Sequence, residues 1–187
     1  MNEQIVININ SLLKLPSELL DVFIKKLKPI TVEKGDYFLK EGELCKNIAL
    51  LTQGAFYSYY QKDGNDVIED FCLEGCFLAD YPAFINNTTA QKNFKAIEKS
   101  ELYIISKEEL EDLYLLNPLY ERSGRLIAEF LFTSWEAKLR DTIFLTPLER
   151  YNKLIKSRPD IIQRVPQYLI ASFLNITPQY LSQLRKK

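Results

Sequence analysis

The sequence predicts an α+β protein with an N-terminal β barrel or sandwich, a long helix and a C-terminal helix-turn-helix. Between residues 31 and 105, short runs rich in Ile, Val, Phe and Tyr are separated by glycines every seven to twelve residues. This spacing is typical of an all-β barrel or sandwich. A helical apolar pattern covers residues 119–144, and two shorter helical patterns follow it.

The first element is a helix within LPSELLDVFIKKLKP, where apolar residues recur at helical spacing. The clearest strand pair lies in YYQKDGNDVIEDF, where Asp63 and Gly64 form the tip of a hairpin. A capping box of Ser106 and Glu109 begins another helix, which ends before Pro118.

The long helical pattern at residues 119–144 has apolar groups on more than one side. Such a helix can lie across its own β domain, but this distribution also favours burial by a second subunit. We therefore expect a homodimer. A second capping box, Thr146 and Glu149 with Pro147 between them, begins the C-terminal module.

Two short helices are expected at the end of the chain. Pro166 opens the first, which stops at Asn175, a residue that tolerates the left-handed conformation of a helix end. Thr177 and Pro178 begin the second, because a threonine oxygen caps a free N–H and a proline there sacrifices no hydrogen bond. Two short helices joined by such a turn describe a helix-turn-helix.

The charge is divided unevenly along a chain whose formal net charge is −1. Residues 146–187 carry eight Lys or Arg against two acidic residues, a balance of +6, which leaves −7 for the rest. This asymmetry indicates a C-terminal module that faces a polyanion.

The composition excludes several classes of enzyme, because the chain contains no histidine. Ser-His-Asp and Cys-His nucleophilic sites and His-ligated metals are unavailable. We expect no enzymatic activity, no metal and no cofactor, and a cupin-like barrel enzyme is a remote alternative.

The chain has three cysteines, which cannot all pair with one another. We expect free thiols in the core, and Cys72 and Cys76 are the alternative candidates for a redox pair. No apolar run reaches the length of a membrane span, and the N-terminus lacks the pattern of a signal peptide, so the expected location is the cytoplasm, with no membrane partner.

This order of β domain, long helix and basic helix-turn-helix resembles the Crp/Fnr family of bacterial transcription regulators. The segment VEKGDYFLKEGELCKNIALLTQGAFYSYYQKDGNDVIEDFCLEGCFLADYPAF is similar to the family's cyclic nucleotide-binding-type jelly-roll barrel. VPQYLIASFLNITPQYLSQLRKK is similar to its helix-turn-helix, without an evident β wing. The resemblance implies a sensory domain at residues 1–117, a dimerisation helix and hinge at residues 118–145, and a DNA-binding domain at residues 146–187.

The resemblance also points to an altered phosphate-binding cassette. The family's Gly-Glu pair falls on Ala-Asp at residues 79–80, and its Arg-Ser pair falls on Ala-Gln at residues 90–91. The arginine that would neutralise a cyclic phosphate is missing, and Lys92 or Lys95 would supply only a point charge. We expect an unknown small-molecule effector other than cyclic AMP. The candidate effector-binding residues are Tyr57, Tyr59, Asp80 and Gln91.

In the family, the second helix of the helix-turn-helix enters the major groove of double-stranded DNA. Here the exposed side of that helix carries glutamine and serine, which can bond to base edges. The threonine at its start and the terminal cations suit phosphates, and two residues near the first helix suit the DNA backbone. The predicted DNA-binding residues are Thr177, Pro178, Gln179, Ser182, Gln183, Arg185, Lys186, Lys187, Arg164 and Gln167.

These observations predict a homodimeric DNA-binding transcription regulator. The alternative is a cyclic nucleotide-binding-like module that binds a ligand or another protein and whose basic end does not meet DNA. Binding to DNA distinguishes the two hypotheses.

Overall fold

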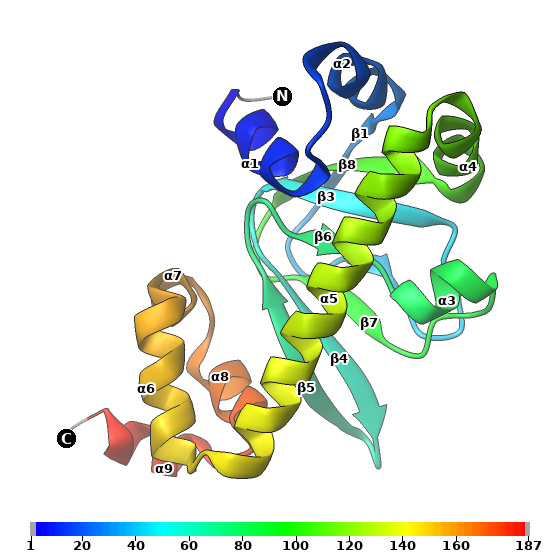
Figure 1. The fold of residues 1–187 in the computed structure, drawn as a ribbon. Helices are drawn as coiled ribbons and strands as arrows, with labels where there is room; N and C mark the ends of the chain where they lie inside the picture. The colour runs from blue at the N-terminus through cyan, green and yellow to red at the C-terminus, as the bar shows by residue number, and fades with distance from the viewer. Residues whose placement is uncertain (1–2, 186–187) are drawn as a thin grey trace.

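A computed structural model describes residues 3–185 of the chain, so Lys186 and Lys187, two of the predicted phosphate contacts, lie outside the described residues. The N-terminal part is a sandwich of two four-stranded antiparallel sheets, with strand orders β1-β8-β3-β6 and β2-β7-β4-β5 (Figure 1). The strands are β1 (Lys28–Val32), β2 (Tyr37–Leu39), β3 (Asn47–Gln53), β4 (Phe56–Lys62), β5 (Asn65–Cys72), β6 (Phe77–Leu78), β7 (Asn93–Ala96) and β8 (Ser100–Ser106).

The two sheets do not join into a closed barrel within the described residues, so of the barrel or sandwich expected from the sequence the structure shows the sandwich. The chain changes sheets at tight corners instead of continuing one sheet around. At one corner, between β3 and β4, Gly54 has a φ of 106°, and a Cβ atom there would lie 2.2 Å from the Ser100 hydroxyl oxygen. Only glycine therefore fits this corner.

The hairpin of β4 and β5 turns at Asp63 and Gly64, as predicted, and both residues have positive φ. Further along the pair, Ser58 lies opposite Asp70 while Tyr59 lies opposite Ile68. Glu69 is therefore the extra residue of a β-bulge. The bulge allows Ile68 and Phe71, three residues apart, to contact the same hydrophobic cluster.

Helices surround the sandwich and continue beyond it (Figure 1). Both predicted capping boxes are present, Ser106 with Glu109 and Thr146 with Glu149. None of the helices in the described part of the chain is long and apolar enough to cross a membrane. The helices are α1 (Glu3–Leu13), α2 (Ser17–Lys26), α3 (Tyr81–Asn86), α4 (Lys107–Leu116), α5 (Pro118–Phe144), α6 (Pro147–Ser157), α7 (Pro159–Arg164), α8 (Gln167–Phe173) and α9 (Pro178–Leu184).

The long helix α5 connects the two ends of the molecule (Figure 1). At its start it packs against the N-terminal helices, where the Ser123 hydroxyl donates to Leu13 O at 2.6 Å and the Tyr120 hydroxyl donates to Leu19 O at 2.8 Å. At its end, helices α6 to α9 form a module that packs on the outer face of the β2-β7-β4-β5 sheet. One apolar cluster joins this module to β4 and β5.

We expect Glu109→Gln to destabilise the fold by about 1 kcal/mol at neutral pH, because it weakens a helix cap. Hydrogen bonds from Lys28 and from Ser106 lower the pKa of Glu109 to about 2, below its unfolded value of roughly 4.3. The stabilisation is complete above the unfolded pKa and is lost as the pH falls toward the folded pKa.

Urea unfolding at several pH values measures this effect. The difference in stability between the wild-type protein and Glu109→Gln should shrink between about pH 4.3 and pH 2. Glu108→Gln, on the same helical turn, is the control and should cost less at neutral pH. A difference that stays constant over this pH range would contradict the assignment.

Candidate functional site

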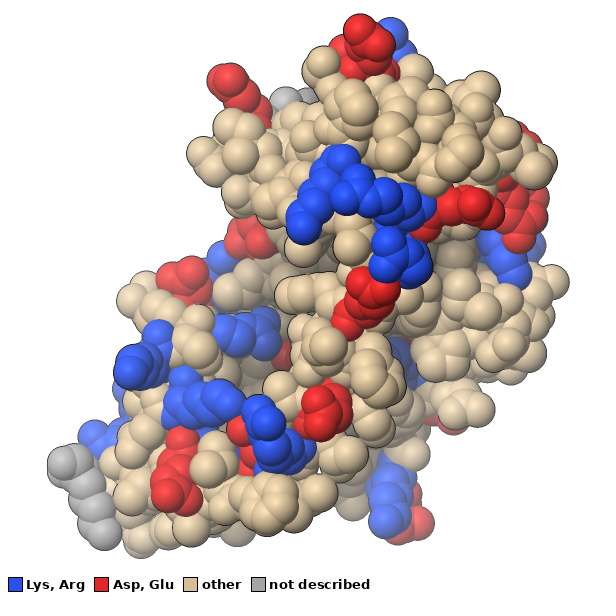
Figure 2. Space-filling view, in the orientation of Figure 1, with Lys and Arg blue, Asp and Glu red and all other residues tan. Residues whose placement is uncertain are grey.

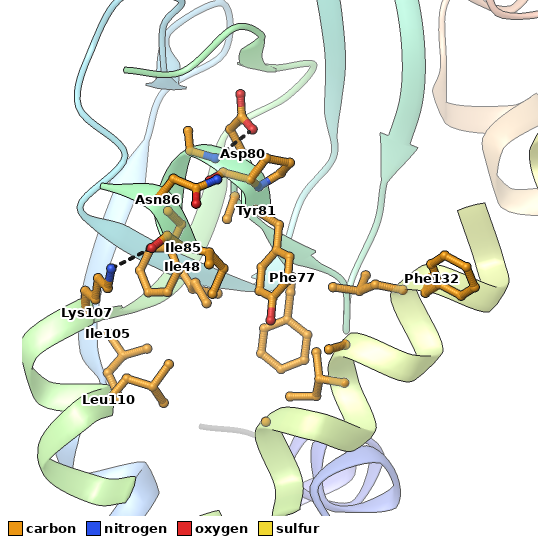
Figure 3. Close-up of a pocket in the computed structure, with 18 of the residues that line it drawn as sticks. Ile48, Phe77, Asp80, Tyr81, Ile85, Asn86, Ile105, Lys107, Leu110 and Phe132 are labelled. Carbon is orange, nitrogen blue, oxygen red and sulfur yellow. Dashed lines mark hydrogen bonds between the residues drawn. The ribbon is translucent and has the colours of Figure 1, made fainter. Parts of the chain in front are cut away.

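A cavity of about 1080 Å³ lies between the sandwich and α5. Its walls come from the inner sides of several strands, from α3 and α4, and from one side of α5 (Figure 3). Most of the lining is apolar or aromatic, and a polar group of side chains lies where β4, β5 and the start of β7 approach one another. A concave, largely apolar site with a few polar groups is typical of ligand binding.

Asp80 lies in the wall of this cavity at the start of α3 (Figure 3). Its side chain is 4% exposed, and its two oxygens accept hydrogen bonds from the backbone N–H of Ala83 at 3.4 Å and of Gln91 at 2.8 Å. The carboxylate therefore caps α3 and ties it to the segment before β7. Asp80 and Gln91, two predicted effector residues, are brought together here, and the Asp80 oxygens are already used.

The polar group of the cavity is an ion pair between Lys92 and Glu69. Lys92 Nζ lies 3.0 Å and 2.8 Å from the two carboxylate oxygens of Glu69, and the Ser58 hydroxyl donates to the same carboxylate at 3.0 Å. Burial opposes the charge of Lys92, but the adjacent Glu69 carboxylate raises the pKa of Lys92. The Lys92 ammonium and the Glu69 carboxylate therefore form an ion pair in which each compensates the charge of the other.

Of the two lysines considered as substitutes for the missing arginine, only Lys92 lines this cavity. Lys95 lies over the ring of Tyr37, with its Nζ 5.1 Å from the ring centroid. Tyr37 donates to or accepts from the hydroxyl of Tyr59 on the outer face of the sheet. Lys95 therefore belongs to the outer face and not to the cavity.

The other two predicted effector residues, Tyr57 and Tyr59, do not line the cavity. Side chains alternate along β4, so Ser58 and Tyr60 face the cavity while Tyr57 and Tyr59 join the outer apolar cluster with α6 to α9. Burial raises the pKa of Tyr57 to about 12, so its phenol stays neutral. Alternation along the strand groups Ser58 with Tyr60 and Tyr57 with Tyr59, but it does not say which pair faces the cavity.

The cysteines are free thiols in this structure. Cys72 is buried at the end of β5 and Cys76 is partly buried before β6. Burial raises the pKa of both thiols. A raised pKa disfavours the thiolate, which is the reactive form in thiol oxidation.

Ion pairs attach the C-terminal module to the sandwich. Arg158 donates to Asp70 at 2.7 Å and to Phe71 O, and Lys138 of α5 lies 3.5 Å from the same Asp70 carboxylate. Arg164 donates to Glu74 at 2.7 Å and 2.9 Å and also to Glu98. Arg164 was predicted to contact DNA, but here its guanidinium is bound to two carboxylates of the sandwich.

The two C-terminal helices α8 and α9 are joined by a short turn. Asn175 has a φ of 55°, as its position at a helix end predicts, and the Thr177 hydroxyl accepts from the Tyr180 N–H at 3.2 Å. Leu181 and Leu184 anchor α9 in the core of the module. The predicted DNA-binding residues of this part that are exposed are Gln167, Thr177, Pro178, Gln179, Ser182, Gln183 and Arg185.

The visible face of the C-terminal module carries Lys and Arg with Asp and Glu between them (Figure 2). Several of these cations have partners within the chain. Arg150 donates to Leu174 O at 2.7 Å, and Lys153 pairs with Asp141 at 2.5 Å. The positive charge that the sequence places in this module is thus partly neutralised or held by backbone carbonyls.

Comparison with known proteins supports the architecture. The family model described as "Cyclic nucleotide-binding domain" matches residues 29–117, which run from β1 to the end of α4. The sandwich and its flanking helix fit that domain. The search of curated proteins gave no match.

Solved structures of three bacterial proteins share the fold over most of the chain. The Thermus thermophilus catabolite activator protein has 13% identity and a TM-score of 0.62, covering 96% of this chain and 85% of that one. The global regulator CLP of Xanthomonas campestris, described as c-di-GMP responsive, has 16% identity and a TM-score of 0.72, covering 91% and 90%. FixK2 of Bradyrhizobium japonicum has 16% identity and a TM-score of 0.67, covering 86% and 83%. At these identities the likeness shows the fold alone.

We expect Asp70→Asn to loosen the C-terminal module, because the substitution removes the charge that Arg158 and Lys138 share. These groups are partly exposed, so the expected cost is about 1 kcal/mol, which corresponds to an approximately fivefold more frequent opening of the module. Amide hydrogen exchange of α6 to α8 measures it.

Asp66→Asn is the matched control, because Asp66 lies on the same strand and its carboxylate accepts only from exposed Gln61 among the described residues. Exchange in α6 to α8 should not change in this variant. Equal acceleration in both variants would show that the Asp70 ion pairs do not hold the module.

Proposed function

We propose that the chain is a DNA-binding transcription regulator of the Crp/Fnr type, in which α8 and α9 form the DNA-binding helix pair. The observation that carries this proposal is the exposed side of α9. Gln179, Ser182 and Gln183 all project from it, and no side chain or backbone group of the described residues engages their polar side-chain atoms. Unused amides and a hydroxyl on a rigid helix suit the reading of base edges.

Buried and capped residues hold this helix in place. Leu181 and Leu184 fix its inner side, Thr177 caps its first turn, and Arg150 binds the carbonyl of Leu174 at the end of α8. Arg185 follows at the exposed end, where a cation suits a DNA phosphate. Positioning by rigid elements is what base-edge contacts require.

The fold supports the same proposal by analogy. The similar structures include a catabolite activator protein and a global regulator that links cell-cell signalling to virulence gene expression, and likeness of fold raises the expectation of a related role. The proposed division is a sensory domain at residues 1–117, a dimerisation helix and hinge at residues 118–145, and a DNA-binding domain at residues 146–187.

We also propose that the protein is a homodimer whose interface is an apolar stripe on α5. Phe132, Trp135, Leu139 and Ile143 recur at spacings of three and four residues and therefore share one side of the helix. Their exposed fractions are 70%, 57%, 45% and 65%. A second copy of α5 would cover this stripe and would set the separation of the two DNA-binding helices.

A second function is favoured by the internal ion pairs of the C-terminal module. Arg158 and Arg164 bind carboxylates of the sandwich and Lys153 binds Asp141, so these three cations are not free to meet DNA. A module that binds a ligand or another protein is therefore the alternative. Salt-dependent retention on DNA separates the two functions.

The DNA proposal predicts that Gln179→Ala with Gln183→Ala will weaken binding to a preferred sequence about tenfold, because two side chains that read bases are lost. Arg185→Gln should instead weaken binding to all DNA and reduce the slope of log K against log salt by about one. Selection of a preferred sequence from random DNA, followed by titration in several salt concentrations, measures both effects.

Gln163→Ala is the matched control, because Gln163 is an exposed glutamine of α7 outside the helix pair. It should bind like the wild-type protein. Absence of salt-dependent retention of the wild-type protein on any DNA would refute the proposed function and favour the alternative.

The dimer proposal predicts that Leu139→Glu will convert the dimer into a monomer, because the substitution buries an unpaired carboxylate in the interface. Light scattering during gel filtration measures the molecular mass. Arg140→Glu introduces the same residue at the next position, outside the apolar stripe, and should remain a dimer. A wild-type protein that is monomeric at all tested concentrations would exclude this interface.

A further inference from the structure

The cavity between the sandwich and α5 has the size of a ligand site and a lining that specifies the ligand's chemistry. Its volume of about 1080 Å³ exceeds what a few waters need. Its apolar part includes side chains from α3, α4 and α5 and from strands β3, β6 and β8 (Figure 3). Residues of this part include Phe77, Tyr81, Leu110, Tyr114 and Ile127.

Every cation in the lining already has a partner. Lys92 is paired with Glu69, and Lys107 donates to the carbonyl of Ile85 at 2.8 Å (Figure 3). Lys138 pairs with Asp70 and also donates to Glu69 O. An anionic ligand would have to break one of these contacts or remain uncompensated in a largely apolar cavity, and both cost free energy.

The buried or partly buried acidic groups of the lining also have hydrogen-bond or ion-pair partners. Glu69 and Asp70 are paired with cations, and both oxygens of Asp80 accept backbone N–H groups. Glu111 is exposed to solvent. A cationic ligand would therefore find no free buried carboxylate in the lining.

Two phenol groups remain available to a ligand. Tyr81 projects from α3 toward Phe77 and α5 (Figure 3), and Tyr114 reaches the cavity from α4. The other described residues leave both hydroxyls without a hydrogen bond. Gly124 of α5 makes room for Tyr114, because a Cβ atom there would lie 2.4 Å from the Tyr114 hydroxyl.

We propose that this cavity binds an uncharged, mainly apolar molecule, and that Tyr81 and Tyr114 bond to its few carbonyl or hydroxyl groups. The inference rests on the proposed function, in which the cavity belongs to the sensory domain. The internal pairing of Lys92 with Glu69 is the feature that excludes anions, including cyclic nucleotides. The ligand class thus follows from the charges of the lining and not from its volume.

The test compares two fluorescent probes on the full-length protein, uncharged Nile red and the anionic probe 8-anilinonaphthalene-1-sulfonate. Nile red should bind saturably and at least tenfold more tightly than the sulfonate. Ala128→Trp fills the cavity from α5 and should reduce Nile red affinity at least tenfold. Ala137→Trp, the same change on the same helix outside the lining, should retain wild-type affinity.

A second variant tests the role of the ion pair directly. Glu69→Gln leaves Lys92 charged but without its anionic partner, so the affinity for the sulfonate probe should rise about tenfold while that for Nile red changes little. Equal affinity of the wild-type protein for both probes, or equal loss in Ala128→Trp and Ala137→Trp, would overturn the proposal. No gain of sulfonate affinity in Glu69→Gln would overturn it as well.

DNA retention of the same preparation separates this inference from the proposed function. Protein that is retained on DNA but fails the probe test refutes the ligand class alone. Saturable Nile red binding, lost in Ala128→Trp, together with no retention on DNA refutes the regulator function and leaves the ligand class standing.

Discussion

The β-bulge at Glu69 is the constraint on which both the cavity and the attachment of the C-terminal module depend. Two consecutive carboxylates of β5 lie at this bulge. Glu69 forms an ion pair with Lys92 in the cavity, and Asp70 forms ion pairs with Arg158 and Lys138. Without the extra residue, Ile68 and Phe71 would face opposite sides of the sheet. The bulge thus preserves the apolar contact with α8 while the acidic pair remains beside α5.

The same short segment of backbone therefore carries the polar end of the cavity and one of the ionic contacts of the module. Lys138 strengthens this arrangement, because it bonds to the Glu69 carbonyl and lies beside the Asp70 carboxylate. Any change in the backbone at residues 69–70 affects both places at once. A bulge beside a binding site is a common way to aim side chains that a regular strand would separate.

Much of the local structure was predictable from the sequence, because short-range physics determines it. The capping boxes at Ser106 and Thr146, the turn at Asp63 and Gly64, and the cap at Thr177 each depend on residues within one turn of the chain. The order of β domain, long helix and short helices was likewise readable from periodicity and turn spacing.

Other features were not predictable, because they depend on contacts between distant residues. Helix α1 is rich in Ile and Asn, which are weak helix formers, and it is held by packing against α5, including the bond from Ser123 to Leu13 O. The side of the sheet that Tyr57 and Tyr59 face follows from the packing of the C-terminal module, which covers the outer face. Composition alone does not say which side of the sheet an aromatic residue faces.

The charge asymmetry of the chain has a second physical meaning that the sequence alone did not reveal. The excess of positive charge in residues 146–187 meets the negative excess of the sandwich at Arg158 with Asp70 and at Arg164 with Glu74 and Glu98. Complementary charge therefore adds to the apolar cluster that joins the two parts of the chain. Because these cations are already paired, base reading in the proposed DNA complex must depend on the uncharged polar face of α9. Among the described residues at the end of that helix, Arg185 is the proposed phosphate contact.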